Sequence, residues 1–184
     1  MNLTHPFLDE DGDKLREECG VFGAINASDA AAATALGLHA LQHRGQEAAG
    51  IVSFDGQEFY ARRGSGHVAE NFSAPEAIAS LPGTMAAGHV RYSTTGGAGL
   101  RNVQPLYAEL AAGGFAIAHN GNISNSLHLR RELVKSGAIF QSTSDTEVII
   151  PLVATSRYPS TLERLVDALR LVEGAYALIV MTPK

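Results

Sequence analysis

The segment ECGVFG, from Glu18 to Gly23, contains the only cysteine among the 184 residues of the chain. It lies where an acidic stretch ends and an apolar stretch begins. Residues 19–25, CGVFGAI, have the apolar side chains of a short buried strand, so we expect the folded body to begin at Cys19. A lone cysteine is often simply a small buried hydrophobe. That structural interpretation has to be weighed against a chemical one.

The composition predicts one globular domain with a sizeable core. Hydrophobic residues make up 45% of the chain, and no apolar run approaches the roughly 18 residues that span a bilayer. The net charge of −5 argues against a nucleic-acid partner and surface. A single cysteine excludes an intrachain disulfide and a cysteine-rich zinc site. The opening residues also lack the features of a signal peptide, so we expect a cytoplasmic location.

The acidic charge is concentrated at the start of the chain. Residues 1–18 contain six acidic and two basic side chains and so carry −4 of the total of −5. Such a segment is typical of a solvated arm. We therefore expect residues 1–18 to be a leader, or propeptide, and residues 19–184 to form the domain.

The predicted elements indicate an α+β fold with antiparallel sheet. Hairpins outnumber β-α-β crossovers, and Asp55-Gly56 is a strong hairpin signal. The segment TTGGAGLRNVQPL, residues 94–106, is expected to be a long functional loop. A core strand at 175–181, close to the last residue, leads us to expect a domain that is incomplete at its C-terminal end. The expected strands cover 19–25, 49–54, 58–63, 85–93, 114–120 and 175–181, and the expected helices cover 28–43, 75–80, 124–137, 145–154 and 161–174.

The histidines suggest two kinds of site. His39 and His43 have the i, i+4 spacing of two metal ligands on a helix, but the zinc-protease pattern is absent and no third ligand is coupled to them. Core or capping histidines are therefore favoured over a metal site. Alternatively, His43, His89 or His119 could activate Cys19 as in papain-like enzymes. Those enzymes place the thiol at the start of a helix, whereas Cys19 begins a predicted strand.

A third possibility explains the boundary at Cys19. If the leader is removed, Cys19 becomes the N-terminal residue, and its α-amine, with a reference pKa of about 7.7–8.0, can act as the base for its own thiol. The thiol could also attack the carbonyl of Glu18 and release the leader through an N→S acyl shift.

Three further motifs contain groups that acyl transfer requires. His119-Asn120-Gly121 can supply a side-chain amide and a backbone N–H to an oxyanion, although Asn-Gly is also a common turn. Arg91 lies at a predicted strand end, where it can pair with a carboxylate or form a surface ion pair. Asp145 lies at a predicted helix start, where it can cap the helix or recognise an ammonium group.

Five signatures follow one another along the chain: ECGVFG, LQHRGQEAAGI, GHVRYSTTG, AHNGNISN and STSDTE. In this order they resemble those of the class II glutamine amidotransferases, which are N-terminal-nucleophile hydrolases. The resemblance extends from about Glu17 to Lys184 and implies a four-layer αββα sandwich that hydrolyses glutamine. It also implies a nucleophile at Cys19, an oxyanion hole at Asn120 and Gly121, and binding of the glutamine backbone groups by Arg91 and Asp145. Arg44 and Gly45 match the loop beside the nucleophile, and Tyr92 matches the aromatic residue of the glutamine loop.

The details of two signatures, YSTTG and HRGQE, are closest to the branch of this family whose acceptor is phosphoribosyl pyrophosphate. That resemblance implies a separate acceptor domain with Mg²⁺ outside this segment, a homo-oligomeric full-length enzyme and no cofactor within the segment. In some relatives an iron–sulfur cluster binds cysteines elsewhere in the chain. The alternatives are another class II enzyme, such as glucosamine-6-phosphate synthase, and a catalytically silent binding module that retains its leader.

Overall fold

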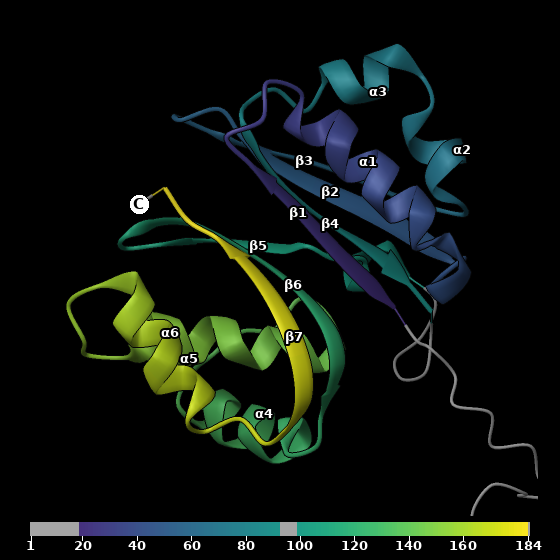
Figure 1. Cartoon of the computed structure of the whole chain (residues 1–184). Coiled ribbons are helices and arrows are strands. Elements are labelled where there is room, and N and C mark those ends of the chain that lie inside the picture. The colour runs from purple at the N-terminus through teal and green to yellow at the C-terminus, as the bar shows by residue number, and fades with distance from the viewer. Residues whose placement is uncertain (1–18, 93–98, 184) are drawn as a thin grey trace, which may run out of the picture.

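The computed structural model describes residues 19–92 and 99–183. The chain forms two antiparallel sheets, one of four strands in the order β1-β4-β2-β3 and one of three strands in the order β5-β6-β7 (Figure 1). The expected α+β class is therefore confirmed. The strands are β1 (Gly20–Ile25), β2 (Ala48–Phe54), β3 (Phe59–Ser65), β4 (Met85–Arg91), β5 (Leu106–Leu110), β6 (Gly113–Ile123) and β7 (Gly174–Met181).

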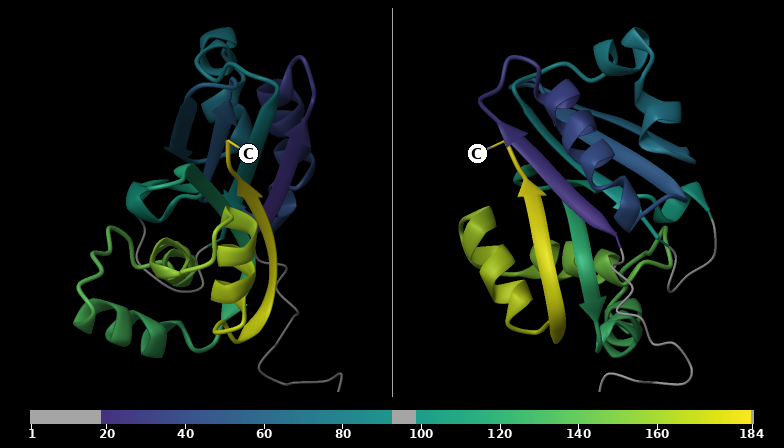
Figure 2. Two further views of the ribbon diagram at one scale, coloured as in Figure 1. Left: turned by 90° about the vertical axis from the view of Figure 1, so that its left-hand side faces the viewer. Right: turned by 45° about the vertical axis from the view of Figure 1, so that its right-hand side comes forward.

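Helices cover the outer side of each sheet (Figures 1 and 2). The first three α-helices lie beside the four-stranded sheet, and the last three lie beside the three-stranded sheet. The α-helices are α1 (Ala30–Ala40), α2 (Val68–Phe72), α3 (Pro75–Ala79), α4 (Ser126–Lys135), α5 (Ile149–Thr155) and α6 (Thr161–Leu169). Three short 3₁₀ helices are η1 (Gln42–Arg44), η2 (Leu100–Asn102) and η3 (Asp145–Val148).

Helix α1 packs closely on the larger sheet because the facing residues are small. Alanines fill much of the helix, and Gly88 in β4 lies directly under it. A β-carbon at Gly88 would lie 2.7 Å from side-chain atoms of both Thr34 and Leu38. The glycine therefore allows the helix to approach the strand, and Leu38 is completely buried there.

The two sheets face one another through a small apolar cluster. Its buried members come from both sheets, and strand β4 contacts β6 across the interface. Ala87 in β4 and Ala116 in β6 are both fully buried. These short side chains let the two strands run close together, so the residues at their ends come near one another. The buried members are Val52, Phe54, Ala87, Ala116 and Met181.

Several local expectations are confirmed and several are wrong. The hairpin at Asp55-Gly56 joins β2 to β3, and the Asp55 carboxylate accepts hydrogen bonds from the backbone N–H groups of Gln57 and Glu58, both at 2.8 Å. Strand β5 was not expected, and its first residue lies in the predicted loop. Helix α2 was not expected either. Both elements are only five residues long, too short for their periodicity to stand out.

The helix boundaries also differ from those expected. Asp29 precedes α1 but makes no side-chain capping hydrogen bond. The helix expected up to His43 ends at Ala40 and continues as the 3₁₀ turn η1, and the helix expected at 145–154 begins as η3. The expected leader, the last residue of the strand expected at 85–93 and residues 94–98 of the predicted loop lie outside the described residues.

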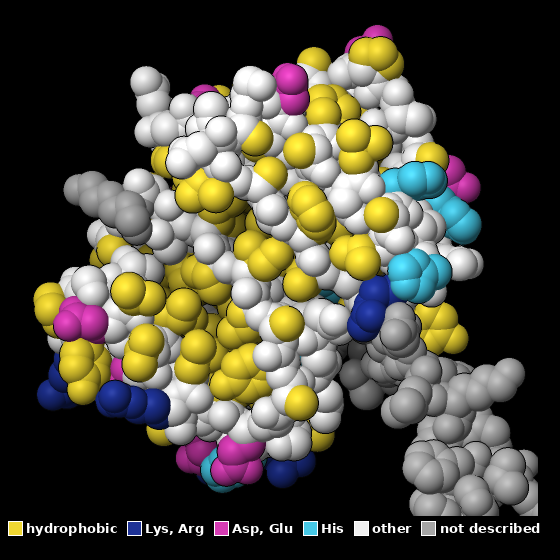
Figure 3. Space-filling view, in the orientation of Figure 1, with side chains coloured by type: hydrophobic (Ala, Val, Ile, Leu, Met, Phe, Trp, Pro, Cys, Tyr) yellow, Lys and Arg dark blue, Asp and Glu magenta, His cyan; other side chains and the backbone are white. Residues whose placement is uncertain are grey.

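Strand β7 has β6 as its sheet partner, so its other edge is an outer edge of the described sheet. Apolar side chains gather on the face that contains β7 in the view of Figure 3. An unpaired edge is a template for further strand pairing.

None of the helices within residues 19–92 and 99–183 has the length and apolar character needed to cross a membrane.

Candidate active site

A pocket lies where the ends of β4 and β6 meet the residue before β1 and the segment that leads into η3. Five of the predicted site residues line it, and they come from four separate parts of the sequence. These are Cys19, Arg91, Tyr92, Gly121 and Asp145. The remaining lining residues are His89, Asn102, Gln104, His119 and Ser144.

Cys19 is half-buried and directly precedes β1. Its Sγ lies 3.6 Å from the carbonyl oxygen of Tyr92, to which the thiol donates. Its own carbonyl accepts a hydrogen bond of 2.8 Å from Nε of Arg44. Arg44 therefore holds the backbone of Cys19 and does not itself line the pocket. The φ angle of Cys19 is +59°, in the left-handed region that residues with a β-carbon rarely adopt.

Gly45 is fixed by its contact with β4. A β-carbon at this position would lie 2.7–2.8 Å from backbone atoms of Arg91, a distance that backbone atoms cannot accommodate. Two residues later, the N–H of Glu47 donates to the carbonyl of Arg91 at 3.1 Å. The HRG signature thus supports both the nucleophile candidate, through Arg44, and the end of β4, through Gly45.

Arg91 ends β4 and is only 7% exposed. A guanidinium can pair with a carboxylate through two parallel hydrogen bonds, and the position of Arg91 in the pocket makes it a candidate for binding one. Tyr92 is more exposed and follows it at the pocket. Of the functional loop expected at residues 94–106, residues 94–98 lie outside the described residues.

At the end of β6, the three residues of the HNG signature occupy different places. His119 and Gly121 line the pocket, whereas the side chain of Asn120 between them does not. Successive side chains of a strand point to opposite faces, which explains this alternation. Gly121 has a φ of +138°, and a β-carbon there would lie 2.2 Å from the carbonyl oxygen of Ala175. The position therefore requires glycine.

Asp145 begins η3, and its carboxylate is anchored by the backbone. Oδ1 accepts a hydrogen bond of 2.8 Å from the N–H of Thr146, and Oδ2 accepts one of 2.9 Å from the N–H of Ile123 in β6. The side chain is 24% exposed and lines the pocket. Asp145 therefore supplies a fixed negative charge to the lining that also contains Arg91.

A buried hydrogen-bond network joins the ends of β6 and η3. Gln104 accepts from the backbone N–H of His119 at 2.8 Å and donates to Oγ1 of Thr146 at 2.9 Å. Nδ1 of His119 is also 2.9 Å from that hydroxyl. The sequence interpretation missed Gln104 and Asn102 as pocket residues. Their polar side chains within a glycine-rich predicted loop were the available signal.

Two buried histidines share the pocket with Cys19. Burial, and then the proximity of His119 and Arg91, lowers the pKa of His89 to about 3. Burial also lowers the pKa of His119, although Asp145 opposes this effect. His89 is therefore neutral at pH 7. Of the three histidines considered as activators of Cys19, His43 does not line the pocket.

The paired histidines His39 and His43 do not form a metal centre with other described side chains. His39 is exposed, and Nδ1 of His43 is 3.2 Å from the carbonyl of Ala40. Within residues 19–92 and 99–183 there is no group of three or more histidine, cysteine or carboxylate side chains arranged to hold a metal ion.

A family model for the glutamine amidotransferase domain matches residues 89–184, more than half of the chain. The chain therefore belongs to the glutamine amidotransferase domain family, and within it falls among the amidophosphoribosyltransferases. It is 59% identical over 185 aligned residues to the amidophosphoribosyltransferase of Rhizobium etli, covering 99% of this chain and 37% of the relative. It is 47% identical to that of Lacticaseibacillus casei, covering 91% of this chain and 87% of the relative.

The fold agrees with this assignment. The structure of glutamine phosphoribosylpyrophosphate amidotransferase from Bacillus subtilis, complexed with ADP and GMP, matches with a TM-score of 0.82 and 42% identity. That match covers 89% of this chain and 35% of the Bacillus chain. The present chain thus spans about a third of the length of the Rhizobium and Bacillus relatives.

The depressed pKa of His89 predicts a stability that falls with acidity. Between the unfolded pKa of about 6.5 and the folded value of about 3, the unfolded chain binds a proton that the folded chain does not. The free energy of unfolding therefore decreases as the pH falls below about 6.5. Denaturant unfolding at pH 7.5 and 5.0 measures the effect, which we expect to be smaller in His89→Gln.

The matched control is His128→Gln, at an exposed position. It should retain the pH dependence of the unmodified chain. An identical pH dependence in the His89→Gln variant would contradict the assignment of a buried, neutral His89.

Proposed function

We propose that this pocket hydrolyses the side-chain amide of glutamine, with Cys19 as the nucleophile. One observation carries the proposal. The pocket places a thiol, the Arg91 guanidinium and the Asp145 carboxylate together, although they come from three distant parts of the sequence. A free amino acid presents an α-carboxylate and an α-ammonium group, which are complementary to Arg91 and Asp145. The thiol is then left for the side chain of the amino acid.

The chemistry follows from these positions. The thiolate of Cys19 attacks Cδ of glutamine, and the carbonyl oxygen becomes an oxyanion. The N–H of Gly121 and the side-chain amide of Asn120 stabilise that charge. Collapse of the intermediate breaks the C–N bond and releases ammonia, which takes the proton that left the thiol. Water then hydrolyses the γ-glutamyl thioester to glutamate and restores the thiol.

Gly121 already lines the pocket, and Asn120 is its neighbour in β6. We propose that the Asn120 amide completes its hydrogen bond to the oxyanion when glutamine is bound. Catalytic hydrogen bonds commonly tighten only in the substrate complex.

We also propose that residues 1–18 are removed, so that the α-amine of Cys19 becomes the base. The φ angle of +59° at Cys19 supports this. A left-handed conformation costs a residue with a β-carbon roughly 1–2 kcal/mol. The φ dihedral is defined by the carbonyl carbon of the preceding residue, so cleavage at Glu18-Cys19 releases Cys19 from this backbone constraint. The same cleavage creates the amine that the mechanism uses.

For the whole protein, we propose that the ammonia is transferred to phosphoribosyl pyrophosphate, giving 5-phosphoribosylamine for purine synthesis. The names of the relatives support this acceptor over that of a glucosamine-6-phosphate synthase. The same proposal includes an acceptor site that binds Mg²⁺, a homo-oligomeric assembly of the whole protein and a cytoplasmic location.

We also propose that the domain is a four-layer αββα sandwich. The helices on the outer side of each sheet support this arrangement (Figure 2).

Cys19→Ala is expected to abolish glutamine hydrolysis and leave the fold intact, because the variant lacks the nucleophile. Glutaminase activity of the full-length protein, compared with its circular dichroism spectrum, measures both outcomes. In the unmodified protein, 6-diazo-5-oxo-norleucine should label Cys19. A variant that keeps more than a few per cent of the activity would show that the thiol is only structural.

Removal of the leader predicts that active protein begins at Cys19. Intact-mass measurement of the active full-length protein, followed by sequencing of its N-terminus, provides the check. Full glutaminase activity in protein that still carries Met1 would exclude the α-amine of Cys19 as the base.

Arg91 and Asn120 should give different kinetic signatures. Arg91→Gln removes a partner of the α-carboxylate, so KM for glutamine should rise about tenfold or more, in line with the roughly 1.5–3 kcal/mol of a charge-assisted hydrogen bond. Asn120→Ala removes an oxyanion donor and should lower kcat by about a hundredfold or more. Steady-state kinetics in the full-length protein distinguish them, and matching changes in KM and kcat would refute the two roles.

A further inference from the structure

The segment that carries Asp145 into the pocket has little regular structure of its own. Residues 141–144 belong to no helix or strand, and η3 begins only at Asp145. A carboxylate that is to meet a single ammonium group needs a fixed position, because a misplacement of about 1 Å can cost two orders of magnitude in rate. Something outside the pocket must therefore hold this segment.

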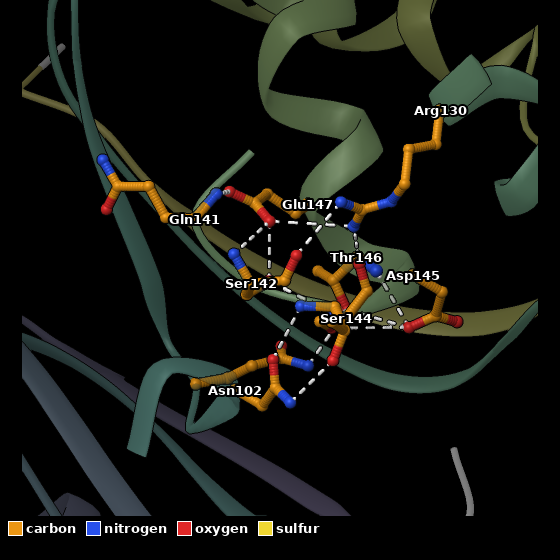
Figure 4. Close-up of polar contacts among 10 residues, drawn as sticks. Asn102, Arg130, Gln141, Ser142, Ser144, Asp145, Thr146 and Glu147 are labelled. Carbon is orange, nitrogen blue, oxygen red and sulfur yellow. Dashed lines mark hydrogen bonds and ion pairs between the residues drawn. The ribbon is translucent and has the colours of Figure 1, made fainter. Parts of the chain in front are cut away.

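Arg130, from α4, contacts the segment on both sides of its centre. Nη1 donates to the carbonyl of Ser142 at 3.0 Å, and Nη2 donates to the carbonyl of Ser144 at 2.7 Å (Figure 4). The guanidinium also lies over the ring of Phe140, 4.0 Å from its centroid. One planar group thus fixes the two carbonyls that flank Thr143, directly before Asp145.

Glu147, two residues beyond Asp145 in η3, holds the N–H groups of the same segment. Its carboxylate accepts hydrogen bonds from the backbone N–H of Gln141 at 2.7 Å, the backbone N–H of Ser142 at 2.8 Å and the Ser142 hydroxyl at 2.6 Å. Glu147 is buried, and its Oε2 is 3.7 Å from Nη2 of Arg130. The Arg130 guanidinium therefore donates to carbonyl groups of the segment, and the Glu147 carboxylate accepts from its N–H and O–H groups, as Figure 4 shows.

Neither Arg130 nor Glu147 lines the pocket, so any effect on glutamine must pass through the segment that they hold, which brings Ser144 and Asp145 to the pocket. We propose that Arg130 and Glu147 are positioning residues that place the Asp145 carboxylate to recognise the α-ammonium group of the substrate. The inference rests on the proposed function, which assigns that recognition to Asp145. It makes the pair determinants of selectivity for an amino acid over a plain carboxamide.

The identity of Arg130 matters as well as its charge. A guanidinium presents several N–H donors in one plane and can reach two carbonyls at once, whereas the ammonium group of lysine is a compact point charge. Arg130→Lys keeps the positive charge beside Glu147 but loses the double contact with Ser142 and Ser144. The conservative variant therefore tests the geometry directly.

The experiment compares two reagents that alkylate Cys19 in the full-length protein. The first, 6-diazo-5-oxo-norleucine, carries the α-ammonium and α-carboxylate groups of glutamine, and the second, iodoacetamide, carries neither. We expect Arg130→Lys and Glu147→Gln to slow inactivation by the first reagent about tenfold, the scale of one lost charge-assisted hydrogen bond. Inactivation by iodoacetamide should be unchanged. In steady state, KM for glutamine should rise while kcat changes little.

Arg131→Lys is the matched control, because Arg131 is the next residue of α4 and is exposed. It should change neither rate. An Arg130→Lys variant that reacts with both reagents like the unmodified protein, or that is slowed equally with both, would overturn the inference.

Asp145→Asn distinguishes a failure of the proposed role of Asp145 from a failure of the positioning role of Arg130 and Glu147. If that variant also leaves both rates unchanged, the proposed role of Asp145 fails, and if it slows only the amino-acid reagent while Arg130→Lys does not, only the positioning role fails.

Discussion

The close approach of β4 and β6 is the constraint on which the site depends. The two strands belong to different sheets, and they can run side by side because alanines, Ala87 and Ala116, face the interface where larger side chains would separate them. Interiors pack at nearly crystalline density, so even one added methylene at such a contact is felt. The end of β4 contributes Arg91 to the pocket and the end of β6 contributes Gly121. The distance between these groups is thus set by apolar packing away from the chemistry.

Glycine plays a comparable part around the nucleophile candidate. Gly45 lets the turn after η1 lie directly on the backbone of Arg91, and the preceding residue, Arg44, holds the carbonyl of Cys19. A side chain at position 45 would push the turn away from β4, and the support of Cys19 would move with it. The HRG signature therefore links the backbone of Cys19 to the end of β4. This supporting role does not require Arg44 or Gly45 to line the pocket.

The pocket is lined by polar side chains, and its charged groups differ in what they contact. His89 is neutral because burial and the nearby His119 and Arg91 disfavour its protonation. Arg91 and Asp145 line the pocket with opposite charges. Arg130 and Glu147 instead contact the backbone of the segment before Asp145 and do not line the pocket. Under the proposed function, the charges that recognise glutamine and those that support the segment therefore lie on separate side chains.

The sequence alone determined the α+β class, the family, the residues of the signatures and the hairpin at Asp55-Gly56, because these depend on local order and residue type. Four pocket residues could be named in advance: Cys19, Arg91, Gly121 and Asp145. A lone thiol, a glycine and charged residues at predicted strand or helix ends can be recognised from the sequence without knowledge of the fold. Only the tertiary structure decided that His89, Asn102 and Gln104 share the pocket, that Asn120 is not among the residues that line it, and that Arg130 holds the segment before Asp145. Those facts depend on contacts between residues 12 to 42 positions apart, or on which face of a strand is turned inward. Short elements such as α2 and β5 were also beyond the sequence, because five residues carry too little periodic pattern and form through packing on their neighbours.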